Sequence, residues 1–161
     1  MNTDFSNFSN AMVERYMRIC LFYGIYPSMF SADASTGRYF SDPALYNRDR
    51  ELFKRYVPLV QVLSKAGWEA SSAVWSSDPA VYVERWGKWP GALFVTLRNT
   101  SDAAASVTLD LDRQALGLAS SAARVRSVLL GAPEAALAGG ATAITLELPV
   151  REIEMLQIDP P

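Results

Sequence analysis

The stretch "ALFVTLRNTSDAAASVTLDLD", residues 92–112, decides the fold class of this chain. Apolar side chains recur at every second position in both of its halves. These positions are Leu93, Val95, Leu97, Val107, Leu109 and Leu111. Alternation with a period of two is typical of a β-strand with one buried face. The intervening "NTSDAA" has turn-forming residues at hairpin distance, so the stretch predicts two antiparallel strands joined by a turn.

The same alternation recurs along the C-terminal part of the chain. It is clearest in "TAITLELP" (142–149), and "RVRSVLLG" (124–131) and "REIEMLQID" (151–159) also have it. "ASSAVWSS" (70–77) and "VYVERWG" (81–87) supply one or two earlier strands, whereas "GAPEAALAGGA" reads as a long loop of small residues. Six to eight short strands with frequent turns predict an antiparallel β-sandwich.

The N-terminal part has helical spacing instead. A first helix is expected to begin near Ser9 or Asn10, where a side chain can cap the free amides, and to stop at Gly24. The following "IYPSMF" can be a buried strand or an irregular link.

A second helix is expected to begin at Ser41 or Asp42, with Pro43 in its first turn, and to end at Gly67. The sequence therefore predicts an α+β chain: a helical segment of two helices over residues 1–67, followed by an antiparallel β-sandwich over residues 68–161.

Composition excludes several classes of function. The chain has 161 residues, a net charge of −2 and a pI of about 5.2, with no dense run of Lys or Arg, so nucleic acid is not an expected partner. "MNTDFSNFSN" lacks the basic start of a signal peptide, and no apolar run approaches the length of a membrane span. We therefore expect a soluble protein; its compartment is not indicated.

The chain contains no histidine and a single cysteine, Cys20. Without histidine, catalysis by Ser-His-Asp or Cys-His groups is excluded within this chain. Cys20 lies on the apolar side of the first predicted helix and is expected to be a small buried residue. There is no phosphate-binding loop and no metal-ligand constellation, so no cofactor and no metal are expected.

An enzyme built from this chain would have to use carboxylates. The candidates are Asp33, Asp42, Asp49, Glu51, Glu69, Asp78 and Glu84. Asp42 is better explained as a helix cap, Asp49 and Glu51 as helix surface, and Asp78 as a turn residue. Asp33, at the end of "LFYGIYPSMFSAD" (21–33), is the least explained.

Aromatic residues are the remaining signal. Four tryptophans, Trp68, Trp75, Trp86 and Trp89, cluster where helical spacing gives way to strand spacing. Flat rings can pack on the C–H faces of sugars, or they can simply fill an interdomain contact. Both interpretations are open from the sequence.

The order of these segments resembles the C-terminal end of a glycoside hydrolase. "FYGIYPSMFS", "YNRDRELFKRYVPLVQVLSKAGWE", "ALFVTLRNTSDAAASVTLDLD" and "TAITLELPVREIEMLQI" carry the resemblance, which covers nearly the whole chain. In that arrangement the last helices of a (β/α)8 catalytic barrel precede a C-terminal antiparallel β-sandwich. Most of a barrel is missing here, because a barrel needs about 250 residues.

The resemblance implies that "LFYGIYPSMFSAD" would be the last barrel strand with its loop, near the mouth of the active site. Carbohydrate would then be bordered by six residues of this region. These are Tyr26, Ser28, Met29, Phe30, Asp33 and Arg38. The catalytic acids of such enzymes usually lie on earlier strands, so the resemblance transfers no catalytic residue to this chain.

Helices that belong against a barrel would expose apolar stripes without it. We therefore expect the helices to pack on the remainder of a barrel, or on a second copy through residues 11–30 and 45–63.

Three functions follow. The first is the C-terminal part of a carbohydrate-active hydrolase, inactive alone. The second is an independent β-sandwich module that binds carbohydrate or protein and has a helical oligomerisation arm; stacking of Trp86 or Trp89 on sugar would favour it. The third is a self-contained enzyme that uses Asp33.

Overall fold

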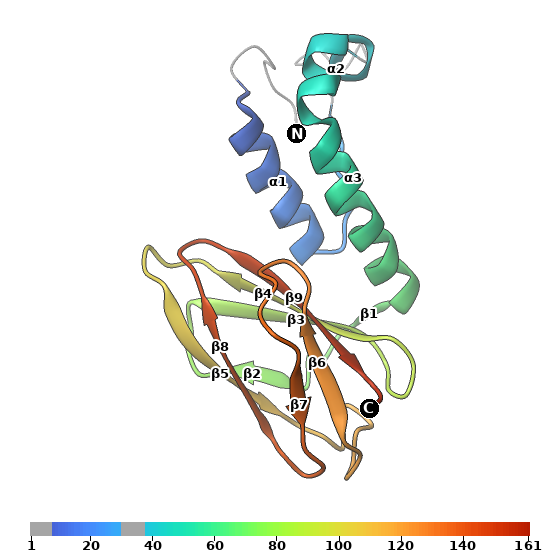
Figure 1. Cartoon of the computed structure of the whole chain (residues 1–161), viewed down its shortest axis with the longest axis vertical. Helices are drawn as coiled ribbons and strands as arrows, with labels where there is room; N and C mark the ends of the chain where they lie inside the picture. Colours follow the sequence, from blue (N-terminus) through green and yellow to red (C-terminus); the bar gives the residue numbers. More distant parts are fainter. Residues whose placement is uncertain (1–7, 30–37) are drawn as a thin grey trace. The chain divides into compact units, whose positions relative to one another are not determined.

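The computed structural model describes residues 8–29 and 38–161 and divides the chain into two compact units, Met1–Val62 and Leu63–Pro161 (Figure 1). We call them the helical unit and the sandwich unit. The helices are α1 (Asn10–Phe22), α2 (Arg38–Ser41) and α3 (Pro43–Ala66). The strands are β1 (Trp68–Glu69), β2 (Val74–Ser76), β3 (Val81–Gly87), β4 (Leu93–Asn99), β5 (Ala105–Leu111), β6 (Ala123–Ser127), β7 (Ala135–Leu137), β8 (Ala143–Leu148) and β9 (Ile153–Asp159). The predicted α+β class is confirmed.

The two long helices begin and end where local signals predict. The Met12 amide donates to the Ser9 side chain (3.2 Å), and the Ala44 amide donates to the Asp42 carboxylate (2.9 Å), so both caps are formed. Beyond the two helices, Gly24 and Gly67 have positive φ angles of 60° and 87°. Short helix α2 was not predicted.

The segment after α1 is irregular over its described residues 25–29, which agrees with the expected irregular link and not with the barrel strand that the resemblance implied. The reason is visible at Ser28. The Tyr16 hydroxyl donates to the Ser28 carbonyl (3.1 Å) and accepts from the Ser28 amide (3.0 Å). One side chain of α1 thus occupies both backbone groups that a neighbouring strand would need.

The sandwich unit contains two antiparallel sheets. One has six strands in the order β1-β3-β4-β9-β6-β7, and the other has three in the order β2-β5-β8 (Figure 1). The predicted hairpin between residues 92 and 112 is wrong, because β4 and β5 belong to different sheets. β4 pairs with β3 and β9, while β5 pairs with β2 and β8. Alternation alone cannot separate a hairpin from two strands that face one core from opposite sheets.

Asn99 holds the crossing between the two sheets. Its amide nitrogen donates to the carbonyls of Ala103 (2.8 Å), Leu148 (3.2 Å) and Pro149 (3.0 Å), and its oxygen accepts from the Ser101 amide (2.9 Å). The turn chemistry of "NTSDAA" is real, but it redirects the chain rather than closing a hairpin. A further correction is β7, which lies in the segment expected to be a loop.

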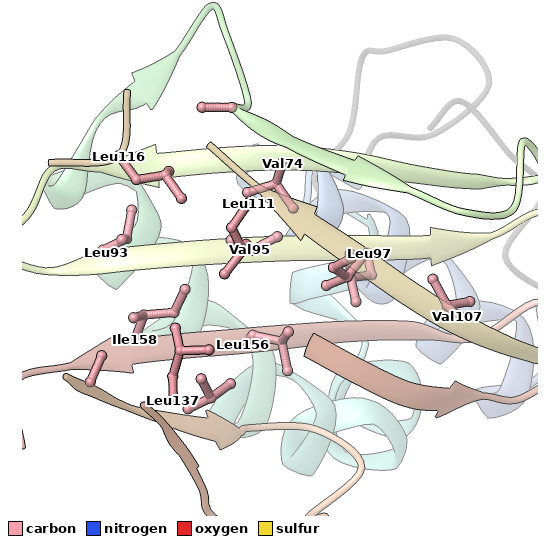
Figure 2. Close-up of a cluster of buried hydrophobic side chains, with 14 of the residues drawn as sticks. Val74, Leu93, Val95, Leu97, Val107, Leu111, Leu116, Leu137, Leu156 and Ile158 are labelled. Atoms are coloured by element: carbon pink, nitrogen blue, oxygen red, sulfur yellow. The ribbon is translucent and has the colours of Figure 1, made fainter. Parts of the chain in front are cut away.

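Side chains from both sheets form the main core (Figure 2). Val95 and Leu97 come from β4, and Val107 and Leu109 come from β5, which are the alternating positions of the deciding stretch. Burial of such side chains contributes about 1.5–3 kcal/mol each relative to exposure. The predicted inward faces are therefore confirmed, although the pairing of these strands is not.

Candidate functional site

The residues predicted to border a ligand have different environments. Tyr26 and Ser28 are exposed, whereas Met29 is buried. Arg38 begins α2. Phe30 and Asp33 lie outside the described residues. A carbohydrate border formed by these six residues therefore stays a prediction.

Asp49 of α3 is fully buried, contrary to its interpretation as helix surface. Asn10 of α1 (2.8 Å) and Tyr39 of α2 (2.8 Å) donate to its two carboxylate oxygens, and Arg48 donates to both (2.9 and 2.7 Å). Arg48 also donates to the carbonyl of Phe8. The carboxylate therefore joins three helices of one unit.

Glu14 forms a second network between α1 and α3. Its carboxylate accepts from Arg18 (3.0 Å) and from the Tyr56 hydroxyl (3.0 Å), and Arg55 lies 3.6 Å away. Arg18 also donates to the Tyr56 oxygen (3.1 Å). Glu14 was not among the candidate acids because its partner Tyr56 is distant in the sequence.

Neither carboxyl suits a general acid. Burial raises the pKa of Asp49, but hydrogen bonds from Arg48, Asn10 and Tyr39 outweigh burial and hold this pKa below its ordinary value. The pKa of Glu14 is also lowered, because its hydrogen bonds to Arg18 and Tyr56 and the charges of Arg18 and Arg55 outweigh its burial. A glycosidase acid must keep its proton near neutral pH, which requires a raised pKa. Both groups therefore act as structural anions.

Glu154 of β9 is the corresponding buried carboxylate of the sandwich unit. It accepts from the backbone amides of Leu129 (2.9 Å), Leu130 (3.0 Å) and Met155 (2.7 Å), with a longer contact from Val128 (3.2 Å). The Ser127 hydroxyl adds a bond of 2.6 Å. Such a saturated acceptor holds the turn after β6 and leaves no free oxygen for chemistry.

The four tryptophans separate into distinct roles. Trp86 is buried, and its indole N–H donates to the Thr96 hydroxyl (3.1 Å). Trp89 is partly buried and packs against the main core. The ring of Trp86 is therefore covered by protein, whereas stacking of the partly buried Trp89 on a sugar stays a prediction. Trp68 and Trp75 are exposed.

Trp75 belongs to the outward face of the three-stranded sheet. We call this surface the Trp75 face: Trp75 of β2, Ser106, Thr108 and Asp110 of β5, and Ala143, Thr145 and Glu147 of β8. Trp75 is the register partner of Asp110, Thr108 of Thr145, and Ser106 of Glu147. All seven residues are exposed except Thr108, which is half-buried. The signal was present in the sequence, because these are the polar positions that alternate with the buried ones.

Neither a metal site nor a membrane-spanning helix is present in the described residues. Within residues 8–29 and 38–161, no group of three or more His, Cys, Asp or Glu side chains is placed to hold a metal ion. Over the same part of the chain, no helix combines the length and the apolar character needed to cross a bilayer. Cys20 is free and buried, as predicted, and burial raises the pKa of its thiol.

Comparison with known proteins gives matches in structure only. No family model matches the chain, and no curated protein matches it. Alpha-galactosidase I from Mortierella vinacea aligns with 95% of this chain and 36% of its own, with a TM-score of 0.57 and 16% identity. A proposed alpha-N-acetylgalactosaminidase from Bacillus halodurans aligns with 96% of this chain and 32% of its own, with a TM-score of 0.56 and 15% identity.

A GH27 β-L-arabinopyranosidase from Geobacillus stearothermophilus aligns with 96% of this chain and 31% of its own, with a TM-score of 0.51 and 14% identity. These likenesses establish a shared fold. The chain spans about a third of the length of the solved structures that it matches. Its fold is thus that of one portion of several glycoside hydrolases.

Proposed function

We propose that this chain is the C-terminal part of a carbohydrate-active glycoside hydrolase, without catalytic activity by itself. The observation that carries the proposal is the unequal coverage. The alignments use at least 95% of this chain but at most 36% of the three hydrolases named above. A whole enzyme of that kind needs far more chain than this one contains.

The chemistry of the carboxylates supports the same conclusion. Asp49, Glu14 and Glu154 are occupied by donors. Glu69 is 3.2 Å from Arg85 and 3.3 Å from Lys88, and Glu84 accepts from the indole N–H of Trp68 (2.7 Å). Glycoside hydrolysis needs two carboxyl groups that face one bond, one of them able to give a proton. Each of these five carboxylates already has a hydrogen-bond or ion-pair partner.

The surface of the helical unit supports a larger assembly. In the described part of this unit, six large apolar side chains are 40–52% exposed: Met12, Tyr23, Ile25, Tyr26, Phe40 and Val62. Exposed apolar surface of this extent is typical of a surface that contacts other protein. We propose that it packs on the remainder of a barrel domain, with self-association through residues 11–30 and 45–63 as the alternative. Light scattering at tens of micromolar separates the two, because a strictly monomeric chain excludes self-association.

The direct test is an assay of the purified chain on aryl glycosides. The substrates are p-nitrophenyl α-galactoside, α-N-acetylgalactosaminide and β-L-arabinopyranoside, chosen from the names of the three structural neighbours. Mortierella vinacea alpha-galactosidase I serves as the positive control. We expect no hydrolysis above the enzyme-free blank at any concentration of the chain.

Hydrolysis that Asp33→Asn abolishes would contradict the proposal and favour a self-contained enzyme. A second measurement addresses the larger protein itself. Sequencing the natural DNA upstream of the Met1 codon is expected to reveal an open frame with strand–helix repeats. An in-frame stop with a ribosome-binding site beside Met1 would instead favour an independent module.

A further inference from the structure

We propose that the Trp75 face is a platform that binds a neutral sugar ring, with the indole of Trp75 as its stacking element. The inference rests on the proposed function, because it names a carbohydrate contact within a chain assigned to a carbohydrate-active enzyme. It locates that contact on the outward face of the sheet β2-β5-β8 (Figure 1).

Trp75 differs from the other three tryptophans. Trp75 and Trp68 are almost equally exposed, at 55% and 57%. Trp68 donates its indole N–H to Glu84, and Trp86 donates to Thr96. No hydrogen bond or ring contact joins the Trp75 side chain to any residue in the described part of the chain. Both the ring face and the N–H of Trp75 are thus available to a ligand.

The neighbours of Trp75 supply hydrogen-bonding groups at regular intervals. Asp110 is directly opposite Trp75 in the sheet, and Ala143 is the next partner in the same row. The following row contains Thr108 and Thr145, whose hydroxyl oxygens are 3.3 Å apart. Neighbouring positions in one row are about 4.8 Å apart, which is the spacing between strands. The two rows are about 7 Å apart, which is a two-residue step along a strand. The platform therefore has the dimensions of one or two sugar rings, and small Ala143 leaves space beside Asp110.

Charge selects the kind of sugar. The seven residues of the Trp75 face include Asp110 and Glu147 but no Lys or Arg. An acidic surface repels nucleic acid, sulfated glycans and polyuronates. Carboxylates form short and strong bonds with hydroxyl donors, which neutral sugars offer along one edge. The C–H face of the same ring can pack on the indole.

Stability does not account for the position of Trp75. Trp75 lies in the edge strand β2 with its side chain on the face opposite the core, since its neighbour Val74 and not Trp75 belongs to the main core. Surface substitutions away from packed or paired groups change stability little. Trp75→Ala should therefore fold normally, which makes it a usable variant.

The test is affinity electrophoresis of the purified chain in native gels that contain guar galactomannan, arabinoxylan or polygalacturonate. We expect retardation by a neutral polysaccharide and none by polygalacturonate. Trp75→Ala should weaken the binding at least tenfold, because truncation of a central aromatic contact usually removes most of the binding energy. Asp110→Ala should weaken it severalfold. Trp68→Ala, an equally exposed tryptophan outside the Trp75 face, is the matched control and should bind as the wild type does.

Four results would overturn the inference. Three come from the gels: the absence of retardation by both neutral polysaccharides, equal binding by Trp75→Ala and the wild type, or equal losses in Trp75→Ala and Trp68→Ala. Self-association that Trp75→Ala abolishes would assign the face to a second copy and would also overturn it. Because the aryl-glycoside assay measures hydrolysis and the gels measure retention, failure of the platform leaves the proposed function testable on its own. Hydrolysis by the chain would contradict the proposed function whatever the gels report.

Discussion

Asp49 in the helical unit and Glu154 in the sandwich unit are both buried carboxylates, but different kinds of donor surround them. Among the described residues, Asp49 accepts from the side chains of Asn10, Tyr39 and Arg48 and from no backbone amide. Glu154 accepts mainly from backbone amides of the turn after β6 and from its own neighbour in β9. The first arrangement joins helices; the second fixes the path of a turn.

The difference has an energetic consequence. A side chain that loses its partner can turn toward water, and the guanidinium side chain of Arg48 is already 31% exposed. A backbone amide can find a new partner only if the chain itself moves. Removal of a buried acceptor lowers the free energy of unfolding most where its donors cannot move to water, because each unsatisfied donor then keeps its full desolvation penalty. The two carboxylates should thus respond differently to the same substitution.

The largest effect is expected for Glu154→Ala. It removes the carboxylate to which the amides of Leu130 and Met155 donate, so we expect the free energy of unfolding of the sandwich unit to fall by about 3–5 kcal/mol. All four tryptophans lie within this unit, so their fluorescence in a urea titration reports its unfolding. Glu134→Ala, which removes an exposed glutamate 3.9 Å from Arg124, is the control and should cost less than about 0.5 kcal/mol. If Glu154→Ala lowers the free energy of unfolding by less than about 1 kcal/mol, the claim that its amide donors cannot find other partners is contradicted.

Asp49→Ala should have a smaller effect, of about 2–3 kcal/mol, because Arg48 can recover part of its solvation. Circular dichroism at 222 nm reports this change, since the long helices contribute most of that signal. Glu51→Ala on the same helix is the matched control, because Glu51 is exposed and pairs with Lys54 at the surface. If Asp49→Ala costs more than Glu154→Ala, the distinction between mobile and fixed donors is wrong.

The dependence of stability on pH sharpens the helical side of the comparison. The pKa of Asp49 is lowered in the folded state, so its contribution is complete above its unfolded pKa of about 3.9 and is lost as pH falls through the folded pKa. The free energy of unfolding of the wild-type helical unit should fall as the pH decreases through this acidic range. In the Asp49→Asn variant it should fall less steeply. The difference in the free energy of unfolding between the wild type and Asp49→Asn should therefore decrease as the pH falls from 5 toward 2. Curves that stay parallel over this range would show that protonation of Asp49 does not contribute.

Local signals account for what the sequence predicted correctly. The caps at Ser9 and Asp42 act within four residues, and strand alternation identifies the inward faces of β4 and β5. The path between these strands could not be predicted, because Asn99 finds its acceptors Leu148 and Pro149 about fifty residues away. Short strand β7 was missed for a related reason. Its own sequence has no strong alternation, and it is a strand because it pairs with β6.

The candidate sites show the same limit. Asp49 lies in the charged run "NRDRE", whose composition favours a solvated helix face, and only Asn10 and Tyr39 reveal that it is buried. Trp86 and Trp75 could not be distinguished by residue type. Their opposite exposures follow from strand register, because Trp75 faces outward beside Asp110 and Trp86 reaches Thr96 on a buried surface.

The smallest expected effect, for Ser127→Ala, tests which donors hold Glu154. The hydroxyl of Ser127 donates to Glu154 (2.6 Å) and accepts from the Ala132 amide (3.1 Å). Because the backbone donors remain, we expect a loss of about 1 kcal/mol in the tryptophan-monitored transition. Ser121→Ala, a serine of the same unit with an exposed side chain, is the control and should leave the transition unchanged. If Ser127→Ala approaches the cost of Glu154→Ala, then Glu154 depends on a side-chain donor as Asp49 does, and the contrast between the two units fails.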